Sequence, residues 1–322
     1  MSITRRGFLA GASAGVAVAP MARRALAQAR AKIKVGYIKI IDLLPFFAAS
    51  DKGYFGEEGL DVEAVPFAGG AAIGSGLASG DLQIGWIGAP PLIRARDAGL
   101  DFKWVVGGCI NGQWLYDTDC LMVQGTSPVR APKDMVGKKL ASNALSSVNH
   151  VFMVAWLAQH GVAADRVSFV EVPFPQMEAA LKAGRVDVIS LHEPFVTMSV
   201  LRGGVQVVAH AWSEVAPRFV IASFAASDKW IKGNRETVQA FIRAWNKGVD
   251  YANANPGDVR STLLPKWTGL TPDVAASVIN PLFDKKLLIA DVRPMADLCH
   301  QYKFSKRRIS PEEQVSDVVA AS

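Results

Sequence analysis

Polar side chains gather just ahead of an apolar stretch in residues 142–161, SNALSSVNHVFMVAWLAQHG. Ser146, Ser147, Asn149 and His150 stand where this stretch would begin a helix. The first backbone N–H groups of a helix lack intrahelical partners and carry partial positive charge, so they can bind an anion without a basic side chain. One Ser or Asn could instead only cap the helix. His150 could also pack as a neutral buried ring.

Other candidate ligand contacts follow predicted strands. Asp42 could contact a ligand or cap the next helix, the glycines at 69 and 70 could admit a ligand or only form a turn, and Trp86 could stack on a ligand or fill the core. Outside the 142–161 segment, the candidate contacts are Ile41, Asp42, Phe67, Gly69, Gly70, Trp86, Gly88, Ala89, Pro90, Phe174 and Glu193.

The carboxylate of Glu193 would repel an anion unless it meets an amine, a hydroxyl or an arginine. It therefore favours a zwitterion or a ligand with an N–H group, unless it only holds a hinge or the opposite lobe. Arg218 is either a surface arginine or a clamp for an acidic group. Aromatic residues near the predicted ligand loops favour an organic ligand: Phe46, Phe67, Trp86, Trp114, Phe174 and Phe195.

The elements that must position these residues alternate between strand and helix. Strands are predicted at 32–41, 61–67, 81–88, 102–108, 139–142, 167–173, 188–194, 204–212 and 218–227. Helices are predicted at 45–60, 69–80, 89–99 and 175–187, after residue 147, and from residue 234 onward. This alternation is typical of an α/β fold with parallel, doubly wound sheets. The segment 119–125 is predicted to be an extended crossover between two such units, with a cleft between them.

Composition limits the classes of partner. The chain has 322 residues, half of them hydrophobic and only 20% charged, which is enough for one large domain or two lobes with their own cores. Its formal charge of +6 falls to +2 without Arg5, Arg6, Arg23 and Arg24. No stripe of basic residues interleaved with aromatics is present in the sequence, which argues against a nucleic-acid partner.

The first 29 residues have the pattern of an export signal: a charged start, an apolar stretch and a small-residue cleavage site. The letters TRRGFL at residues 4–9 favour the twin-arginine route, with an ordinary secretion signal as the alternative. No Cys lies near the cleavage site, so we expect a soluble exported protein rather than a lipoprotein.

Neither the cysteine spacing nor any catalytic motif in the sequence indicates an enzyme. Cys109, Cys120 and Cys299 match no zinc pattern, and Cys109 and Cys120 are either a disulfide or buried free thiols. The sequence has no GxSxG, HExxH, Walker A or dinucleotide-binding motif. We therefore expect no catalytic residue, no metal and no cofactor.

Several segments resemble the periplasmic substrate-binding proteins of ABC importers in the nitrate, sulfonate, taurine and thiamine-precursor group. The similar segments are 45–63, 76–105, 134–141, 148–162, 173–195 and 236–256. The resemblance covers Lys32 to Pro281 in order. Sulfonate-binding relatives also carry hydroxyls and a following His at the segment of Ser146 to His150, which favours a binding role there. Some taurine-binding relatives have an apolar residue at the position of Glu193, so this chain departs from that pattern.

The resemblance implies a two-lobed periplasmic binding protein fold of type II. Its expected divisions are a signal peptide at 1–29, lobe 1 at 30–120 and 215–322, and lobe 2 at 121–214. It implies a monomer that closes on a small organic anion or zwitterion, such as an alkyl or aryl sulfonate or a taurine-like solute. The closed form would deliver the solute to a membrane permease and its ATPase, and would meet the membrane only there. A pyrimidine thiamine precursor, an aromatic carboxylate or nitrate is the alternative ligand; a periplasmic sensor or an exported enzyme is the more remote alternative.

Overall fold

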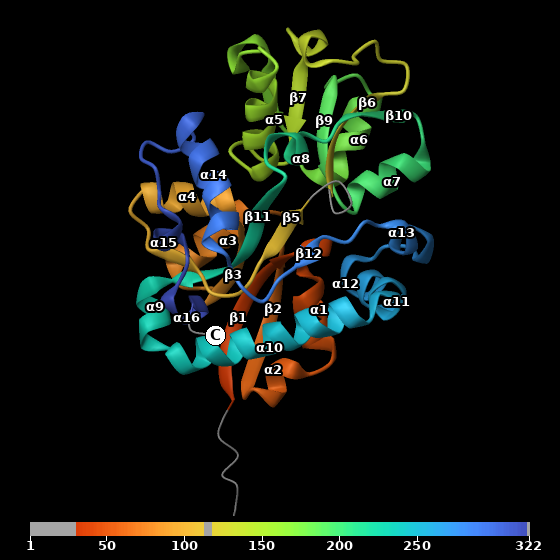
Figure 1. Cartoon of the computed structure of the whole chain (residues 1–322). Helices are drawn as coiled ribbons and strands as arrows, with labels where there is room; N and C mark the ends of the chain where they lie inside the picture. Colours follow the sequence, from red (N-terminus) through yellow and green to blue (C-terminus); the bar gives the residue numbers. More distant parts are fainter. Residues whose placement is uncertain (1–29, 113–117, 321–322) are drawn as a thin grey trace, which may run out of the picture.

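The computed structural model describes residues 30–112 and 118–320, whose strands form two sheets flanked by helices (Figure 1). Within these residues the larger sheet has seven strands: β1 (Ala31–Ile38), β2 (Leu60–Phe67), β3 (Ile84–Gly88), β4 (Phe102–Trp104), β5 (Cys109–Gly112), β11 (Arg218–Ser227) and β12 (Leu282–Phe283). The smaller sheet has five: β6 (Asp119–Gln124), β7 (Lys139–Ser142), β8 (Ser168–Glu171), β9 (Val188–His192) and β10 (Val205–Ala209). We call each sheet with its helices a lobe, lobe 1 being the larger.

The two sheets share one strand arrangement. The larger runs β12-β5-β11-β3-β1-β2, with β4 also paired to β11, and the smaller runs β10-β6-β9-β7-β8. In each, three neighbouring strands are parallel and the fourth, β11 or β6, is antiparallel. That fourth strand is the one that the chain brings directly from the other sheet. The sheets are therefore mixed, which corrects the expectation of parallel sheets and of a crossover at 119–125.

Helices cover both faces of the sheets. Lobe 1 contains α1 (Leu44–Asp51), α2 (Tyr54–Glu57), α3 (Gly70–Ser79), α4 (Ala89–Asp97), α9 (Asp228–Gly233), α10 (Arg235–Ala254), α11 (Pro256–Asp258), α12 (Leu264–Thr268), α13 (Pro272–Ser277), α14 (Ile289–Gln301), α15 (Pro311–Gln314) and α16 (Asp317–Ala320). Lobe 2 contains α5 (Val148–Gln159), α6 (Phe174–Lys182), α7 (Phe195–Arg202) and α8 (Ala211–Val215). One-turn helices lie at Ile41–Leu43, Pro132–Met135 and Ala164–Arg166, and a π-helical turn lies at Val259–Leu263.

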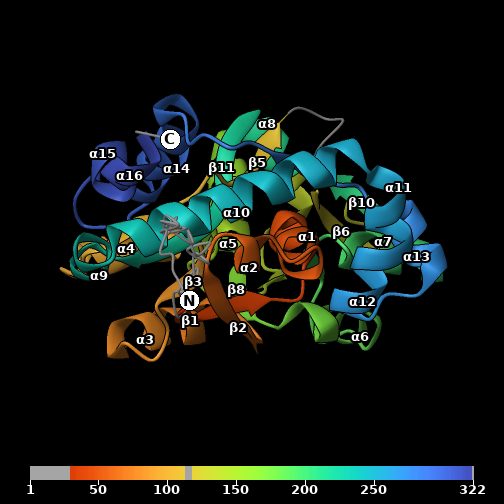
Figure 2. The same ribbon diagram turned by 90° about the horizontal axis from the view of Figure 1, so that it is seen from below.

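The helix α10 crosses lobe 1 beside α1 and α2, as the view from below shows (Figure 2). Its buried face places Phe241 and Trp245 in the core, where Phe241 stacks on Phe55 with ring centroids 5.2 Å apart. A Cβ at Gly248 would lie 2.1 Å from the carbonyl oxygen of Pro45, so only glycine lets α10 approach α1 this closely.

Two expected elements are divided in the structure. The predicted helix at 45–60 splits into α1 and α2 at Gly53, whose φ of 79° lies in the left-handed region that glycine tolerates. The predicted strand at 102–108 ends at Trp104, and β5 begins only at Cys109. Between them a Cβ at Gly107 would lie 1.9 Å from the carbonyl oxygen of Asp284.

All three cysteines are buried, and Cys109 and Cys120 form no disulfide with each other. Among the helices described, none is long and apolar enough to cross a membrane. A search of residues 30–112 and 118–320 finds no group of His, Cys, Asp or Glu side chains able to hold a metal ion. The expected export signal lies outside the described residues, as does Trp114.

Candidate ligand cleft between the two lobes

The helices α4 and α5 begin on opposite sides of the boundary between the lobes. Gly88 is the N-cap of α4 in lobe 1, and Ser147 is the N-cap of α5 in lobe 2. A Cβ at Gly88 would lie 3.5 Å from Cγ2 of Val148, the first residue of α5. Two helix starts therefore face one another across the boundary. Among the first three residues of α4 only Ala89 has a backbone N–H, because Pro90 and Pro91 have none.

The helix-cap interpretation of the opening segment is confirmed for Ser147. Its Oγ accepts a hydrogen bond from the backbone N–H of His150 at 3.4 Å and is 2.9 Å from Oγ of Ser142. Only 8% of Ser147 is exposed. A contact between Ser147 and a ligand stays a prediction.

Ser146 and His150 are joined by a second hydrogen bond. The backbone N–H of Ser146 donates to Nδ1 of His150 at 2.9 Å, and Ser146 has a φ of 62°. The His150 ring lies 4.5 Å from the Phe169 ring of lobe 2 and 5.1 Å from the Phe304 ring of lobe 1. Burial among these groups lowers the pKa of His150 to about 4, so the ring is neutral near pH 7.

The side chain of Asn149 forms its hydrogen bonds inside lobe 2. Its amide nitrogen donates to Oδ2 of Asp119 at 2.6 Å and to Oγ of Ser190 at 2.8 Å. Only 3% of Asn149 is exposed. The side chain therefore anchors the first turn of α5 to β6 and β9, and both amide hydrogens have protein acceptors rather than a place for a ligand.

The carboxylate of Glu193 also has protein partners. One oxygen accepts from the hydroxyl of Thr197 at 2.7 Å and from the backbone N–H of Ile279 at 3.4 Å, and the other accepts from the backbone N–H of Thr197 at 3.1 Å. Its burial raises the pKa of Glu193. Because Ile279 belongs to lobe 1, these bonds favour the interpretation that Glu193 holds the opposite lobe. The argument for a zwitterionic ligand therefore loses its basis.

Asp42 and His192 meet across the boundary between the lobes. Nε2 of His192 donates to Oδ1 of Asp42 at 2.7 Å, and the two residues are 3% and 1% exposed, respectively. The His192 ring stacks on Trp212 with centroids 5.1 Å apart. Burial and the neighbouring Asp42 carboxylate, which accepts a hydrogen bond from the thiol, raise the pKa of Cys109 well above its usual range. Asp42 therefore joins the lobes instead of capping a helix.

The lobe 1 candidates divide between core and boundary. Trp86 packs against Phe224 and Trp245 at 5.1 and 6.1 Å, which favours the core interpretation over stacking on a ligand. Phe46 is also a core ring, and the fully buried side chains of Ile41 and Ala89 belong to the same cluster. Pro90 is buried in the first turn of α4.

Other predicted positions remain partly exposed. Phe67 ends β2, and the glycines at 69 and 70 begin α3 with open space at both Cβ positions. In lobe 2, Phe174 stacks on Phe195 with centroids 5.5 Å apart and an interplanar angle of 18°. These rings stay candidates for the organic part of a ligand.

Arg218 has a structural partner. Its Nε and Nη2 donate to the two carboxylate oxygens of Asp291 at 2.8 and 2.7 Å. Asp291 is buried, so this bidentate pair fixes β11 to α14. A guanidinium engaged in this way does not serve as the clamp for an acidic group that the sequence left open.

Two further residues of interest, Asn143 and Phe304, were not among the candidates named from the sequence. Asn143 directly follows β7, and its buried Oδ1 has no hydrogen-bond partner in the described part of the chain. Its position after a lobe 2 strand was the signal that could have identified it. Phe304 gave no such signal, because it lies more than 150 residues from the His150 ring that it touches.

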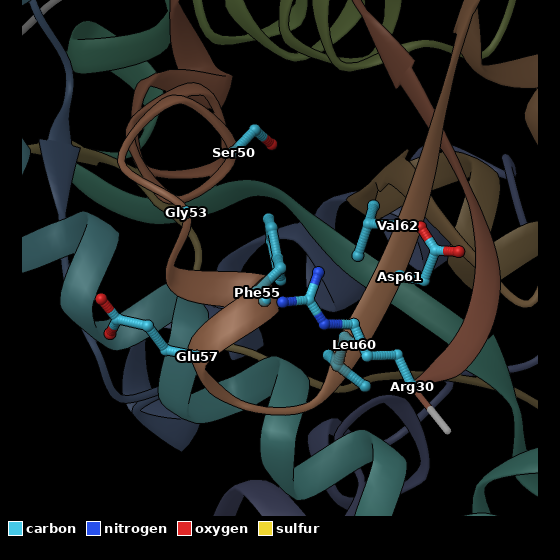
Figure 3. Close-up of a pocket in the computed structure, with 9 residues that line it drawn as sticks. Arg30, Ser50, Gly53, Phe55, Glu57, Leu60, Asp61 and Val62 are labelled. Atoms are coloured by element: carbon cyan, nitrogen blue, oxygen red, sulfur yellow. The ribbon is translucent and has the colours of Figure 1, made fainter. Parts of the chain in front are cut away.

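Two cavities lie away from this boundary. One, of about 450 Å³, lies between α2 and the start of β2, where Arg30 extends over Phe55 and Leu60 (Figure 3). The other, of about 310 Å³, lies between β8 and α6 and includes Lys139 and Arg185. Neither contains the helix starts of α4 and α5.

Comparison with curated proteins finds binding proteins. A Bacillus subtilis (strain 168) protein named "Putative aliphatic sulfonates-binding protein" is 25% identical over 286 residues, which is 86% of this chain and 82% of that protein. The taurine-binding periplasmic protein of Escherichia coli (strain K12) is 30% identical over 140 residues, which is 44% of this chain and 42% of that protein.

The fold matches solved binding-protein structures. The periplasmic aliphatic sulphonate binding protein SsuA from Escherichia coli has a TM-score of 0.74 at 19% identity, over 91% of this chain and 99% of that one. The alkanesulfonate-binding protein SsuA from Xanthomonas axonopodis pv. citri, bound to MOPS, has a TM-score of 0.73 at 19% identity, over 90% and 97%. The fold is thus that of the periplasmic binding proteins. The NMT1/THI5-like family model matches residues 40–259, so the chain belongs to the NMT1/THI5-like family.

Proposed function

We propose that this chain is the solute-binding component of an ABC importer and that it captures a small organic anion, such as an alkyl or aryl sulfonate. The observation that carries the proposal is the meeting of two helix starts, at Gly88 in lobe 1 and at Ser147 in lobe 2. An anion placed there would meet the N–H of Ala89 in lobe 1 and the N–H groups of the first turn of α5 in lobe 2, so its binding would stabilise the closed arrangement.

The chemistry of the boundary supports an organic anion. The nearby carboxylates of Asp42 and Glu193 already accept hydrogen bonds from protein donors, so part of their charge is offset. The stacked Phe174 and Phe195 rings and the partly exposed Phe67 offer apolar surface to a carbon skeleton. The relatives named for aliphatic sulfonates and taurine support the same class of ligand.

The remaining assignments belong to the same proposal. The chain acts by binding rather than catalysis, as a monomer in the periplasm, after export through the twin-arginine route and removal of residues 1–29. It docks on a membrane permease with its ATPase. The proposed lobe boundaries near residues 120 and 214 are supported by the change of sheet between β5 and β6 and between β10 and β11.

A thermal-shift screen of the chain from residue 30 onward would test the ligand class. The solutes are alkyl and aryl sulfonates, taurine, aromatic carboxylates, pyrimidines, nitrate and bicarbonate. A solute that binds the folded chain raises its melting temperature according to concentration and affinity. We expect a sulfonate to give the largest shift. If only nitrate or bicarbonate raises the melting temperature, the proposal of an organic ligand is wrong.

The variant Gly88→Asp tests the position of the anion. A Cβ at position 88 would meet its nearest neighbour at 3.5 Å, an ordinary contact distance, so α4 should keep its start while the new charge repels an anion there. The matched control is Ser227→Asp, which places the same charge at the N-cap of α9 in lobe 1. Sulfonate binding should be lost in Gly88→Asp and kept in Ser227→Asp. Equal binding by both variants would exclude the start of α4 as the anion site.

A further inference from the structure

Two left-handed backbone conformations adjoin one contact between the lobes. Among the described residues, Ser146 and Lys303 are the only non-glycine positions with positive φ, each at 62°. Ser146 is bonded to His150, and Lys303 precedes Phe304, while the His150 and Phe304 rings meet edge to face at 5.1 Å and 83°. Such a backbone conformation is unfavourable for a residue with a side chain and persists only where surrounding contacts hold it.

On the lobe 2 side, the His150 ring is what holds Ser146. The Ser146 N–H donates to Nδ1 of the ring at 2.9 Å. Because Nδ1 accepts this bond, a neutral ring carries its own hydrogen on Nε2. The Phe169 ring, 4.5 Å away, limits movement of His150 on the side of β8. Without the ring, the turn before Ser147 would lose the contact that maintains its unusual φ.

On the lobe 1 side, the end of α14 presents Phe304. The N–H of Phe304 donates to the carbonyl of Cys299 at 2.8 Å, and the N–H of Lys303 donates to the carbonyl of His300 at 3.2 Å. This pair of bonds is the Schellman ending of a helix, in which the left-handed residue is usually glycine. The ending directs Phe304 toward lobe 2, and it does so although Lys303 must adopt a conformation unfavourable for a side chain.

We propose that His150 is a positioning residue that couples lobe closure to the turn at Ser146 and Ser147. In the closed arrangement Phe304 confines the His150 ring, and the ring holds the Ser146 N–H, which orients the chain at the start of α5. When the lobes separate, the ring loses Phe304 and the turn is free to relax. The inference rests on the proposed function, because it assigns His150 to shaping the solute site rather than to touching the solute.

This coupling has a thermodynamic consequence. Contacts made only in the closed arrangement add to the apparent affinity of any solute that requires closure. Loss of one ordinary hydrogen bond is worth about 1 kcal/mol, or roughly a fivefold to tenfold change in an equilibrium constant. The hydrogen-exchange rate of the Ser146 N–H and the affinity for solute should therefore both depend on the hydrogen bond between Ser146 and His150.

The test uses the variants His150→Phe, Phe304→Ala and the double variant Ser146→Gly with His150→Phe. Phenylalanine keeps a ring between Phe169 and Phe304 and removes the Nδ1 acceptor. Glycine tolerates the left-handed φ without the hydrogen bond. The matched control is His160→Phe, which changes a His at the far end of α5, where the ring packs on Trp156 at 4.8 Å.

The first measurement is hydrogen exchange of the Ser146 amide by NMR, without solute. We expect exchange to be roughly tenfold faster in His150→Phe, faster in Phe304→Ala and unchanged in His160→Phe. Unchanged exchange in His150→Phe would contradict the positioning role. Unchanged exchange in Phe304→Ala would contradict the coupling to closure.

The second measurement is calorimetric binding of ethanesulfonate. We expect roughly tenfold weaker binding in His150→Phe and recovery to within about threefold in the double variant. No recovery would mean that His150 itself contacts the solute, which overturns the inference. If the unaltered chain does not bind ethanesulfonate while the exchange pattern is as expected, the positioning role is supported and the sulfonate proposal alone is contradicted.

Discussion

The buried Asp42–His192 pair allows a quantitative test of the contact between the lobes. Alanine at position 42 would remove the acceptor of His192 and of the Cys109 thiol, all in an environment closed to water. Breaking a buried pair by removing one partner costs about 3–5 kcal/mol, because the other polar group stays buried without compensation. Phenylalanine at position 192 keeps the stacking on Trp212 and removes the donor, at a cost of about 1.5–3 kcal/mol.

The two changes should be strongly non-additive. Since Asp42→Ala and His192→Phe remove the same hydrogen bond, the double variant should be more stable than the sum of the single effects by about 1.5 kcal/mol or more. The measurement is urea unfolding of the solute-free chain, followed by tryptophan fluorescence and circular dichroism, with coincident transitions required. Additivity within about 0.5 kcal/mol would refute the reasoning, because the pair would then not join the lobes in the solute-free protein.

Three further outcomes are expected. Lys303→Gly should raise the free energy of unfolding by about 0.5–1 kcal/mol, because glycine suits the left-handed end of α14; a decrease in urea midpoint would contradict this. Gly248→Ala should lower it by about 1–3 kcal/mol, because the new Cβ would meet the Pro45 carbonyl at 2.1 Å; unchanged stability would show that α10 can move away from α1. Finally, the pKa of His150 is about 4 in the folded chain, against an ordinary value of 6.5. As the pH drops, the unfolded chain therefore takes up a proton at this residue before the folded chain does. The free energy of unfolding should fall by up to about 3 kcal/mol between pH 6.5 and pH 4. This His150 contribution to the pH slope should be absent in His150→Phe.

Features of the fold that depend on neighbours along the chain could be predicted from the sequence. The alternating residues of β1 and β2 and the Ser147 cap of α5 are examples. The antiparallel insertion of β6 could not be predicted, because Asp119 pairs with His192, far along the chain. An extended apolar segment has the same local pattern whether it crosses between lobes or lies within a sheet.

The site shows the same limit at the level of side chains. Asn149 and Glu193 have the residue types of ligand contacts, but their donors and acceptors are used by Asp119, Ser190, Thr197 and the backbone of another segment. Whether a polar group is free for a ligand depends on long-range partners, which spacing along the chain does not contain. Ser147 could be predicted as a cap because its partner, the backbone N–H of His150, lies only three residues further along the chain.

The position of β11 in the larger sheet sets the order in which the two lobes can be completed. All five strands of the smaller sheet lie between residues 119 and 209, so that sheet can be completed from one continuous segment. The larger sheet has β3 on one side of β11 and β5 on the other, and it stays in two parts until residues 218–227 have been made. We expect nascent chains that end shortly after residue 209 to protect lobe 2 from proteolysis while β1 to β5 remain open to cleavage. Lobe 1 would thus be synthesised first and finish folding last.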